Sequence, residues 1–168
     1  MATKNIMIVG VGGQGTLLTS RILGGITLAA GYDVKLSEVH GMAQRGGSVV
    51  TFVRYGEKVC EPIVEEGQAD VLIAFERLEA LRYAHFVKKD GVIIVNDQRI
   101  DPMPVVIGDA TYPEGILEDL ENIEVRGLYV DALEAVTVSI TCHAVDRCHP
   151  ESSLAVAQDV LDLVVGQS

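Results

Sequence analysis

The chain has 168 residues, a length typical of a single domain, and its 48% hydrophobic content excludes a disordered or collagen-like protein. The net charge is −11, from 24 acidic and 13 basic residues, which disfavours a protein that wraps nucleic acid. Residues 1–55 nevertheless carry five bases and two acids, a net charge of +3, and they are rich in glycine. This combination favours a small anionic ligand near the amino terminus.

The cysteines and the hydropathy pattern bear on where the protein works. Cys60, Cys142 and Cys148 are too few and too irregularly spaced for a disulfide scaffold, so we expect a reducing compartment. No charged leader precedes an apolar signal core, and no uncharged run reaches the ~18 apolar residues of a membrane span. The sequence therefore predicts a cytoplasmic protein.

A strand and a helix are expected at the start of the chain. Residues 5–11 form an apolar run that ends in glycines, as a buried strand does. Residues 16–30 have helical spacing and stop at Gly31. The helix-destabilising Gly24 and Gly25 indicate either a close crossing within the domain, which we favour, or contact with a partner. The expected buried stripe of this helix is Leu18, Ile22, Leu23, Ile26 and Ala29.

Strands and surface helices are expected to alternate along the rest of the chain. Gly56 and Glu57 suit the two-residue turn of a hairpin between strands at residues 49–55 and 58–64, and Pro62 places the second strand at an edge. The other expected strands are residues 33–39, 69–75, 91–96, 105–107, 124–130 and 135–142. Helices are expected at residues 76–87, 112–121 and 151–165. The first of these helices is expected to present a solvated face formed by Glu76, Arg77, Glu79 and Arg82.

The connection between the second and third strands limits the topology. Only residues 40–48 separate them, whereas a right-handed parallel crossover needs about a dozen residues or more and usually contains a helix. The third strand must therefore turn back antiparallel or leave the sheet. We predict a single α/β domain of three layers, with a Rossmann-like start and a mixed sheet of parallel strands and an antiparallel hairpin.

The first candidate site is the glycine loop over residues 10–15. Gly10, Gly12 and Gly15 match G-x-G-x-x-G between a strand and a helix, where backbone N–H groups and the helix dipole favour a phosphate. In the alternative interpretation, the glycines only permit close packing of strand and helix. Asp33 and Glu38 bracket the place of the acidic residue in dinucleotide folds, so a stand-alone NAD(P)- or FAD-binding oxidoreductase is the alternative function, against which the short 40–48 connection argues.

The second candidate site is the polar loop over residues 40–48. Arg45 can present its planar guanidinium to a phosphate or a carboxylate, and His40 adds a titratable donor. Gln44 and the backbone N–H groups of Gly46 and Gly47 add neutral donors. An exposed turn shaped by its glycines is the alternative. In an open sheet this loop lies beside the glycine loop, at the edge where α/β proteins bind ligands.

Four segments carry a family resemblance, and the most specific is SEVHGMAQRGG. They are GVGGQGTLLTSRIL (residues 10–23), SEVHGMAQRGGSVVTFVRYG (37–56), ADVLIAFERLEALRY (69–83) and VIIVND (92–97). The chain resembles the gamma-type subunit of the 2-oxoacid:ferredoxin oxidoreductases, and most closely the beta subunit of indolepyruvate ferredoxin oxidoreductase.

The resemblance implies a non-catalytic small subunit with no activity alone. The family oxidatively decarboxylates a 2-oxoacid, here an aryl pyruvate, to acyl-coenzyme A and passes electrons to ferredoxin. Thiamine diphosphate and iron–sulfur clusters are expected in the large partner subunit, since this sequence has neither a G-D-G thiamine motif nor a C-x₂-C-x₂-C run. Coenzyme A is expected at a cleft whose predicted binding residues are Gly10, Gly12, Gly13, Gln14, Gly15, His40, Gln44, Arg45, Gly46 and Gly47.

The resemblance covers a core over residues 1–131. Residues 132–168 form a divergent or truncated carboxyl-terminal segment, which we expect to complete the same domain. This segment contains Cys142, His143, Cys148 and His149, which are possible metal ligands. The spacing between the two cysteines is wider than is usual for structural zinc, so the sequence disfavours a metal site here.

Overall fold

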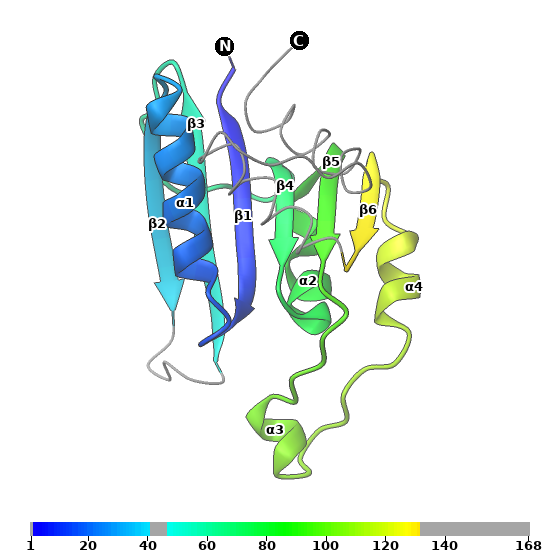
Figure 1. Cartoon of the computed structure of the whole chain (residues 1–168). Coiled ribbons are helices and arrows are strands. Elements are labelled where there is room, and N and C mark those ends of the chain that lie inside the picture. The colour runs from blue at the N-terminus through cyan, green and yellow to red at the C-terminus, as the bar shows by residue number, and fades with distance from the viewer. Residues whose placement is uncertain (1, 41–46, 132–168) are drawn as a thin grey trace, which may run out of the picture.

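The structure is a computed structural model that describes residues 2–40 and 47–131 (Figure 1). In chain order its elements are β1 (Lys4–Val11), α1 (Thr16–Ala29), β2 (Asp33–His40), β3 (Ser48–Gly56), β4 (Ala69–Ala74), α2 (Arg77–Tyr83), the 3₁₀ helix η1 (Ala84–Phe86), β5 (Val87–Val95), α3 (Met103–Val106), α4 (Ile116–Glu121) and β6 (Gly127–Val130).

The six strands form one mixed sheet in the order β2-β3-β1-β4-β5-β6. Strands β1, β4, β5 and β6 are parallel neighbours, whereas β3 lies between β1 and β2 and is antiparallel to both. The prediction of an antiparallel third strand and a mixed sheet is confirmed. Because β3 reverses direction, β1 and β2 run the same way and end at the same edge, which we call the carboxyl edge.

Helices cover both faces of the sheet, so the three-layer prediction is also confirmed (Figure 1). One face of alternating apolar side chains, which includes Ile6, Ile8 and Val53, packs with Leu23 of α1. The opposite face, which includes Met7 and Val9, packs with α2 and α4. The strands in the middle of the sheet are buried on both faces and consist largely of Val, Ile and Leu, as strands between two helical layers require.

Helix α1 follows the predicted stripe only in part. Leu23 is buried and Ile22 and Ile26 pack against the core, as predicted, whereas Leu18 is 64% exposed and Ala29 is exposed. The other buried residues of the helix are Thr16, Ser20, Gly24 and Thr27. Small residues let the helix approach β2 closely, since a Cβ atom on Gly24 would lie 3.1 Å from Cδ1 of Leu36. The buried hydroxyls of Ser20 and Thr27 donate to carbonyl oxygens of their own helix, which removes the cost of burying them. The close crossing predicted at Gly24 is therefore confirmed.

Two predicted strands are wrong. Residues 58–64 are irregular and do not form a hairpin with β3, which pairs with β1 and β2 on its two sides instead. The guanidinium of Arg54 donates to the carbonyl oxygens of Glu61 and Ile63, which fixes this segment as a loop. The expected strand at residues 105–107 is also wrong, because Pro102 precedes the single helical turn of α3 and its carbonyl accepts from the N–H of Val106.

Several predictions are not tested by this part of the chain. The strand expected at residues 135–142 and the helix expected at 151–165 lie outside the described residues. Within residues 2–40 and 47–131, no helix is long and apolar enough to cross a membrane.

The paired glycines of α1 provide a test of the helix packing. Gly25→Ala should raise the free energy of unfolding by ~0.5–1 kcal/mol, because nothing lies within 4 Å of the new Cβ atom and alanine favours helix. Gly24→Leu should lower it by ~1–3 kcal/mol, because the side chain would overlap Leu36. Urea unfolding followed by circular dichroism measures both, and equal effects at the two positions would contradict the close crossing.

Candidate functional site

The glycine loop joins β1 to α1 at the carboxyl edge. Gly13 and Gly15 have φ angles of +102° and +91°, which residues other than glycine rarely adopt. At Gly10 the constraint is space, since a Cβ atom would lie 2.9 Å from Oε1 of Gln14 and 3.1 Å from Cβ of Phe75. Gly10 is therefore a packing position in the floor of the loop, and Gly13 and Gly15 shape its exposed backbone.

The side-chain amide of Gln14 holds the loop in place. Its Oε1 accepts a hydrogen bond of 2.7 Å from the N–H of Val11. Its Nε2 donates to the carbonyl oxygen of Phe75 at 2.9 Å and to Oε1 of Gln98 at 3.0 Å. Both ends of the amide are thus engaged within the chain, and Gln14 ties the loop to the segments that follow β4 and β5. The predicted contact of Gln14 with a ligand stays a prediction.

The second loop begins and ends beside the first. Val11 pairs with Ser48, and the N–H of Gly12 donates to the carbonyl oxygen of Gly47 over 2.9 Å. His40 is the last residue of β2 and pairs through its backbone with Val49. The predicted juxtaposition of the two loops is therefore confirmed at the ends of the second loop. Gln44, Arg45 and Gly46 lie outside the described residues, so their predicted roles remain untested.

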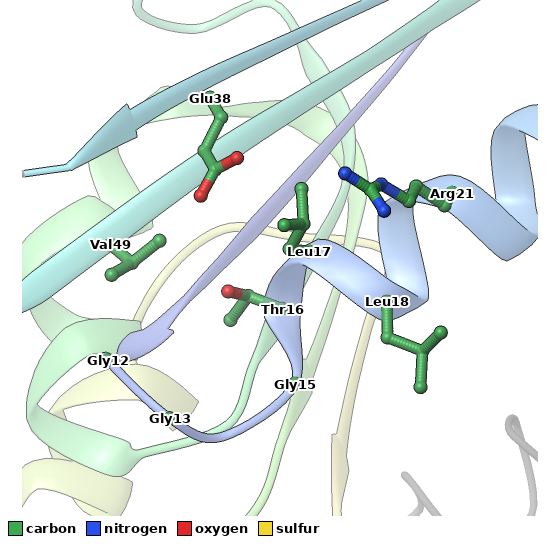
Figure 2. Close-up of a pocket in the computed structure, with 9 residues that line it drawn as sticks. All are labelled: Gly12, Gly13, Gly15, Thr16, Leu17, Leu18, Arg21, Glu38 and Val49. Carbon is green, nitrogen blue, oxygen red and sulfur yellow. The ribbon is translucent and has the colours of Figure 1, made fainter. Parts of the chain in front are cut away.

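A cleft of about 610 Å³ opens between the glycine loop, the first turns of α1 and the ends of β2 and β3 (Figure 2). It brings together Gly12, Gly13 and Gly15 of the predicted glycine loop and six residues outside the G-x-G-x-x-G motif. Its described lining is Gly12, Gly13, Gly15, Thr16, Leu17, Leu18, Arg21, Glu38 and Val49.

The charges at this cleft favour an anionic group at one end. The N-cap residue of α1 is Gly15, which has no side chain to cap the helix, and the first turn contains no acidic residue. Gly15 and Thr16 line the cleft, so the amino-terminal N–H groups and the partial positive charge of α1 lie beside it. Arg21 and Glu38 extend into the space from α1 and from β2 (Figure 2). Such a site can accept a phosphate near the glycines and a hydroxyl or amide donor near Glu38.

Sequence reasoning did not assign Leu17, Leu18 and Arg21 to the site. Leu18 was predicted to lie in the buried stripe of the helix, because helical spacing alone does not say which stripe faces the sheet. A usable signal existed, since Leu17 and Arg21 are four residues apart and therefore share a helix face. Of the two acids near the expected ribose position, Glu38 lines the cleft, whereas Asp33 accepts from the N–H of Val59.

The buried carboxylate of Glu79 is hydrogen-bonded to Ser48, where the second loop joins β3. Glu79 is only 4% exposed, and it accepts hydrogen bonds from the hydroxyl of Ser48 and from Nη1 of Arg82. Burial raises the pKa of the Glu79 carboxyl, and the bonds from Ser48 and Arg82 oppose that rise. The predicted solvated face is therefore wrong at Glu79 and also at Glu76, which is 1% exposed.

The structure adds little on metals. No group of three or more His, Cys, Asp or Glu side chains within residues 2–40 and 47–131 could hold a metal ion. Cys60 is an exposed free thiol in the loop after β3. The possible ligands Cys142, His143, Cys148 and His149 lie outside the described residues.

Comparisons of sequence indicate what this chain is similar to. Residues 5–144 match the profile of a family described as pyruvate ferredoxin/flavodoxin oxidoreductase. A Pyrococcus horikoshii protein named indolepyruvate oxidoreductase subunit IorB is 49% identical over 123 residues, which cover 73% of this chain. The alignment covers 60% of that relative, so this chain spans less than two thirds of its length.

Solved structures share the fold at low sequence identity. A pyruvate oxidoreductase subunit from Thermotoga maritima is 21% identical with a TM-score of 0.55, covering 84% of this chain and 68% of that one. The 2-oxoglutarate:ferredoxin oxidoreductase from Magnetococcus marinus, solved with 2-oxoglutarate, coenzyme A and succinyl-CoA bound, is 12% identical with a TM-score of 0.51. That comparison covers 100% of this chain and 32% of the other.

The amide of Gln14 provides a first test of the site. Gln14→Ala should lower the free energy of unfolding by ~1–3 kcal/mol, because it leaves the partly buried N–H of Val11 without its acceptor. Gln68→Ala is the control, since its Nε2 bonds only the exposed Glu65 in the described part of the chain, and a change within ~0.5 kcal/mol is expected. Equal effects in urea unfolding would show that the amide of Gln14 does not hold the loop.

The pKa of Glu79 provides a second test. Because the folded pKa lies above the unfolded value, the native state binds more protons between the two, and its stability falls as pH rises through that window. Glu79→Gln does not titrate, so wild-type stability relative to this variant should decline from about pH 4.5 upward. Urea unfolding at a series of pH values measures the difference, with the exposed Glu121→Gln as baseline. If the free energy of unfolding of the wild type instead rose with pH relative to that of Glu79→Gln, the burial effect would be contradicted.

Proposed function

The chain belongs to the pyruvate ferredoxin/flavodoxin oxidoreductase family, and we propose that it is the small subunit of a 2-oxoacid:ferredoxin oxidoreductase that binds coenzyme A at its carboxyl edge. The name of the Pyrococcus horikoshii relative supports indolepyruvate or a related aryl pyruvate as the 2-oxoacid. The complex would convert the oxoacid and coenzyme A to acyl-coenzyme A and carbon dioxide, with two electrons passed to ferredoxin.

One observation carries the coenzyme A assignment. The amino terminus of α1, whose N-cap Gly15 has no side chain, lies at a cleft lined by Gly12 and Gly13, and Arg21 adds a cationic side chain about one turn further along. Coenzyme A carries a pyrophosphate and a ribose 3′-phosphate, and helix amino termini and guanidinium groups bind such anions. The coenzyme A bound to the Magnetococcus marinus enzyme, which shares this fold, supports the same ligand class.

The second loop would complete the binding surface. Two of its described residues lie next to the cleft: the carbonyl oxygen of Gly47 accepts from the N–H of Gly12, and His40 pairs with Val49. We propose that Arg45 binds a phosphate of coenzyme A or the carboxylate of the oxoacid, with His40, Gln44 and Gly46 as further donors. Gly10 and Gln14, also predicted as binding residues, would act by shaping the glycine loop.

The oxidative chemistry would belong to a large partner subunit. When bound there, thiamine diphosphate supplies the carbanion chemistry of decarboxylation and iron–sulfur clusters carry electrons. In this sequence Cys60, Cys142 and Cys148 are too far apart for the C-x₂-C-x₂-C run that binds such clusters. The proposed contribution of this chain is to bind and orient the coenzyme.

Glu38 favours a competing interpretation. An acidic residue at the end of the second strand accepts the ribose hydroxyls of NAD in dinucleotide-binding folds, and Glu38 has that position at the cleft. A stand-alone oxidoreductase of this kind would bind NAD(P) or FAD at millimolar concentration or below. Calorimetric titration of the purified chain with these nucleotides and with coenzyme A separates the two interpretations.

Arginine substitutions test the proposed function in the assembled complex. Arg21→Ala and Arg45→Ala should each raise KM for coenzyme A at least ~10-fold with little change in kcat, since each removes a charge-assisted hydrogen bond worth ~1.5–3 kcal/mol. Arg126→Ala is the matched control, because Arg126 is exposed beside the opposite end of β6. Oxoacid-dependent reduction of ferredoxin is measured, and an unchanged kcat/KM for both coenzyme A and oxoacid would contradict the assignment.

A further inference from the structure

A long connection projects from the carboxyl edge between β5 and α4 (Figure 1). We call residues 97–115 the arm, and its tip is the single turn of α3 with the residue that follows. No residue of α3 is buried. Met103, Val106 and Ile107 are 68%, 66% and 61% exposed, and their spacing of three and four residues puts them on one side of the turn. The arm therefore presents an apolar tip to solvent.

The tip is a folded structure despite its exposure. The N–H groups of Val106 and Ile107 donate to the carbonyl oxygens of Pro102 and Met103 at 3.1 and 3.0 Å. Gly108 ends the turn with a φ of +84°, and the N–H of Asp109 returns to the carbonyl of Pro104 at 2.8 Å. An apolar surface ordered by its own backbone loses little conformational freedom when a partner covers it.

The base of the arm is anchored to the buried end of α2. The carboxylate of Glu76 accepts hydrogen bonds from the hydroxyl of Tyr112 and from the N–H of Ile100. The guanidinium of Arg99 lies 4.4 Å from the centre of the Tyr112 ring, a cation–π contact. The segments of the arm on both sides of the tip are thus bonded to the domain, at Ile100 and at Tyr112, so the tip has a defined position relative to the sheet.

The arm is also continuous with the proposed coenzyme site. Gln98, at the start of the arm, accepts the 3.0 Å hydrogen bond from Nε2 of Gln14 in the glycine loop. The carbonyl of the same Gln98 accepts from the N–H of Arg77 at 3.1 Å. A partner seated on the arm would therefore lie at the edge that carries the cleft.

We propose that the arm tip docks into an apolar groove with a basic rim on the large catalytic subunit, an inference that rests on the proposed function. The arm has four carboxylates, of which Asp97 pairs with Arg77 of α2 and Asp101 with Arg99. The other two, Asp109 and Glu114, are exposed, so the arm with Arg77 carries a net charge of −2. A second copy of this chain is a poor occupant, since it would bring two acidic arms together on chains that each carry −11. A basic partner surface complements the arm.

The test removes the apolar side chains and keeps the charge. The variant Val106→Ser with Ile107→Ser should keep the wild-type circular dichroism and thermal unfolding, because both side chains are exposed. It should bind the purified large subunit of the same organism at least ~10-fold more weakly than wild type. The matched control is Leu28→Ser with Ile63→Ser, two side chains that are 64% and 55% exposed at the opposite end of the sheet, and it should bind as wild type does.

Three outcomes would overturn the inference, and they differ in whether the proposed function is also wrong. If wild type binds the large subunit and the arm variant binds within ~2-fold of it, the docking site is wrong and the proposed function stands. If the arm variant instead converts a wild-type homodimer to a monomer without changing affinity for the large subunit, the occupant is a second copy. If wild type captures no large subunit, the proposed function itself is wrong.

Discussion

The antiparallel position of β3 between β1 and β2 is the constraint on which the candidate site depends. A parallel crossover would have put a helix between the second and third strands, with its return at the opposite edge of the sheet. Here β3 returns at once, so Val11 pairs with Ser48 and the N–H of Gly12 reaches the carbonyl of Gly47. The loop that carries Arg45 is therefore fixed at both ends beside the glycine loop.

Two buried carboxylates on one side of α2 then organise the rest of that edge. Burying a charge is costly unless hydrogen bonds replace its hydration, and both groups have such partners. Glu79 binds Ser48, where the second loop rejoins the sheet. Glu76 caps α2 through the N–H of Glu79 and also binds Tyr112 of the arm. Helix α2 thus holds both the start of β3, through Ser48, and the arm, through Tyr112.

The sequence predicted the elements whose signals are local. The apolar run of β1, the G-x-G-x-x-G loop and the short 40–48 connection were enough to predict the mixed sheet and the position of Gly47 and Ser48 beside the glycine loop. The buried face of α1 was predicted only at its apolar positions, because Ser20 and Thr27 are polar and are buried with their hydroxyls bonded to carbonyl oxygens of their own helix. Glu76 and Glu79 were misjudged for a related reason: the partners that make their burial favourable, Ser48 and Tyr112, are distant in sequence.

The two edges of the sheet differ in how fully their polar groups are satisfied. At the amino edge Asp70 accepts from the N–H of Asn5 at 2.8 Å and pairs with Lys88 at 2.7 Å, and Arg54 binds the loop after β3. At the carboxyl edge the N-cap residue of α1, Gly15, has no side chain to cap the helix, Leu18 is exposed in the cleft, and the arm has an apolar tip. Uncapped helix ends and exposed apolar side chains lower stability unless something binds them. Exposed apolar side chains occur at both edges, since Leu28 and Ile63 at the amino edge are 64% and 55% exposed, so they do not distinguish the two edges. What the carboxyl edge adds is the amino terminus of α1 at the cleft, where a bound phosphate would stabilise the free N–H groups.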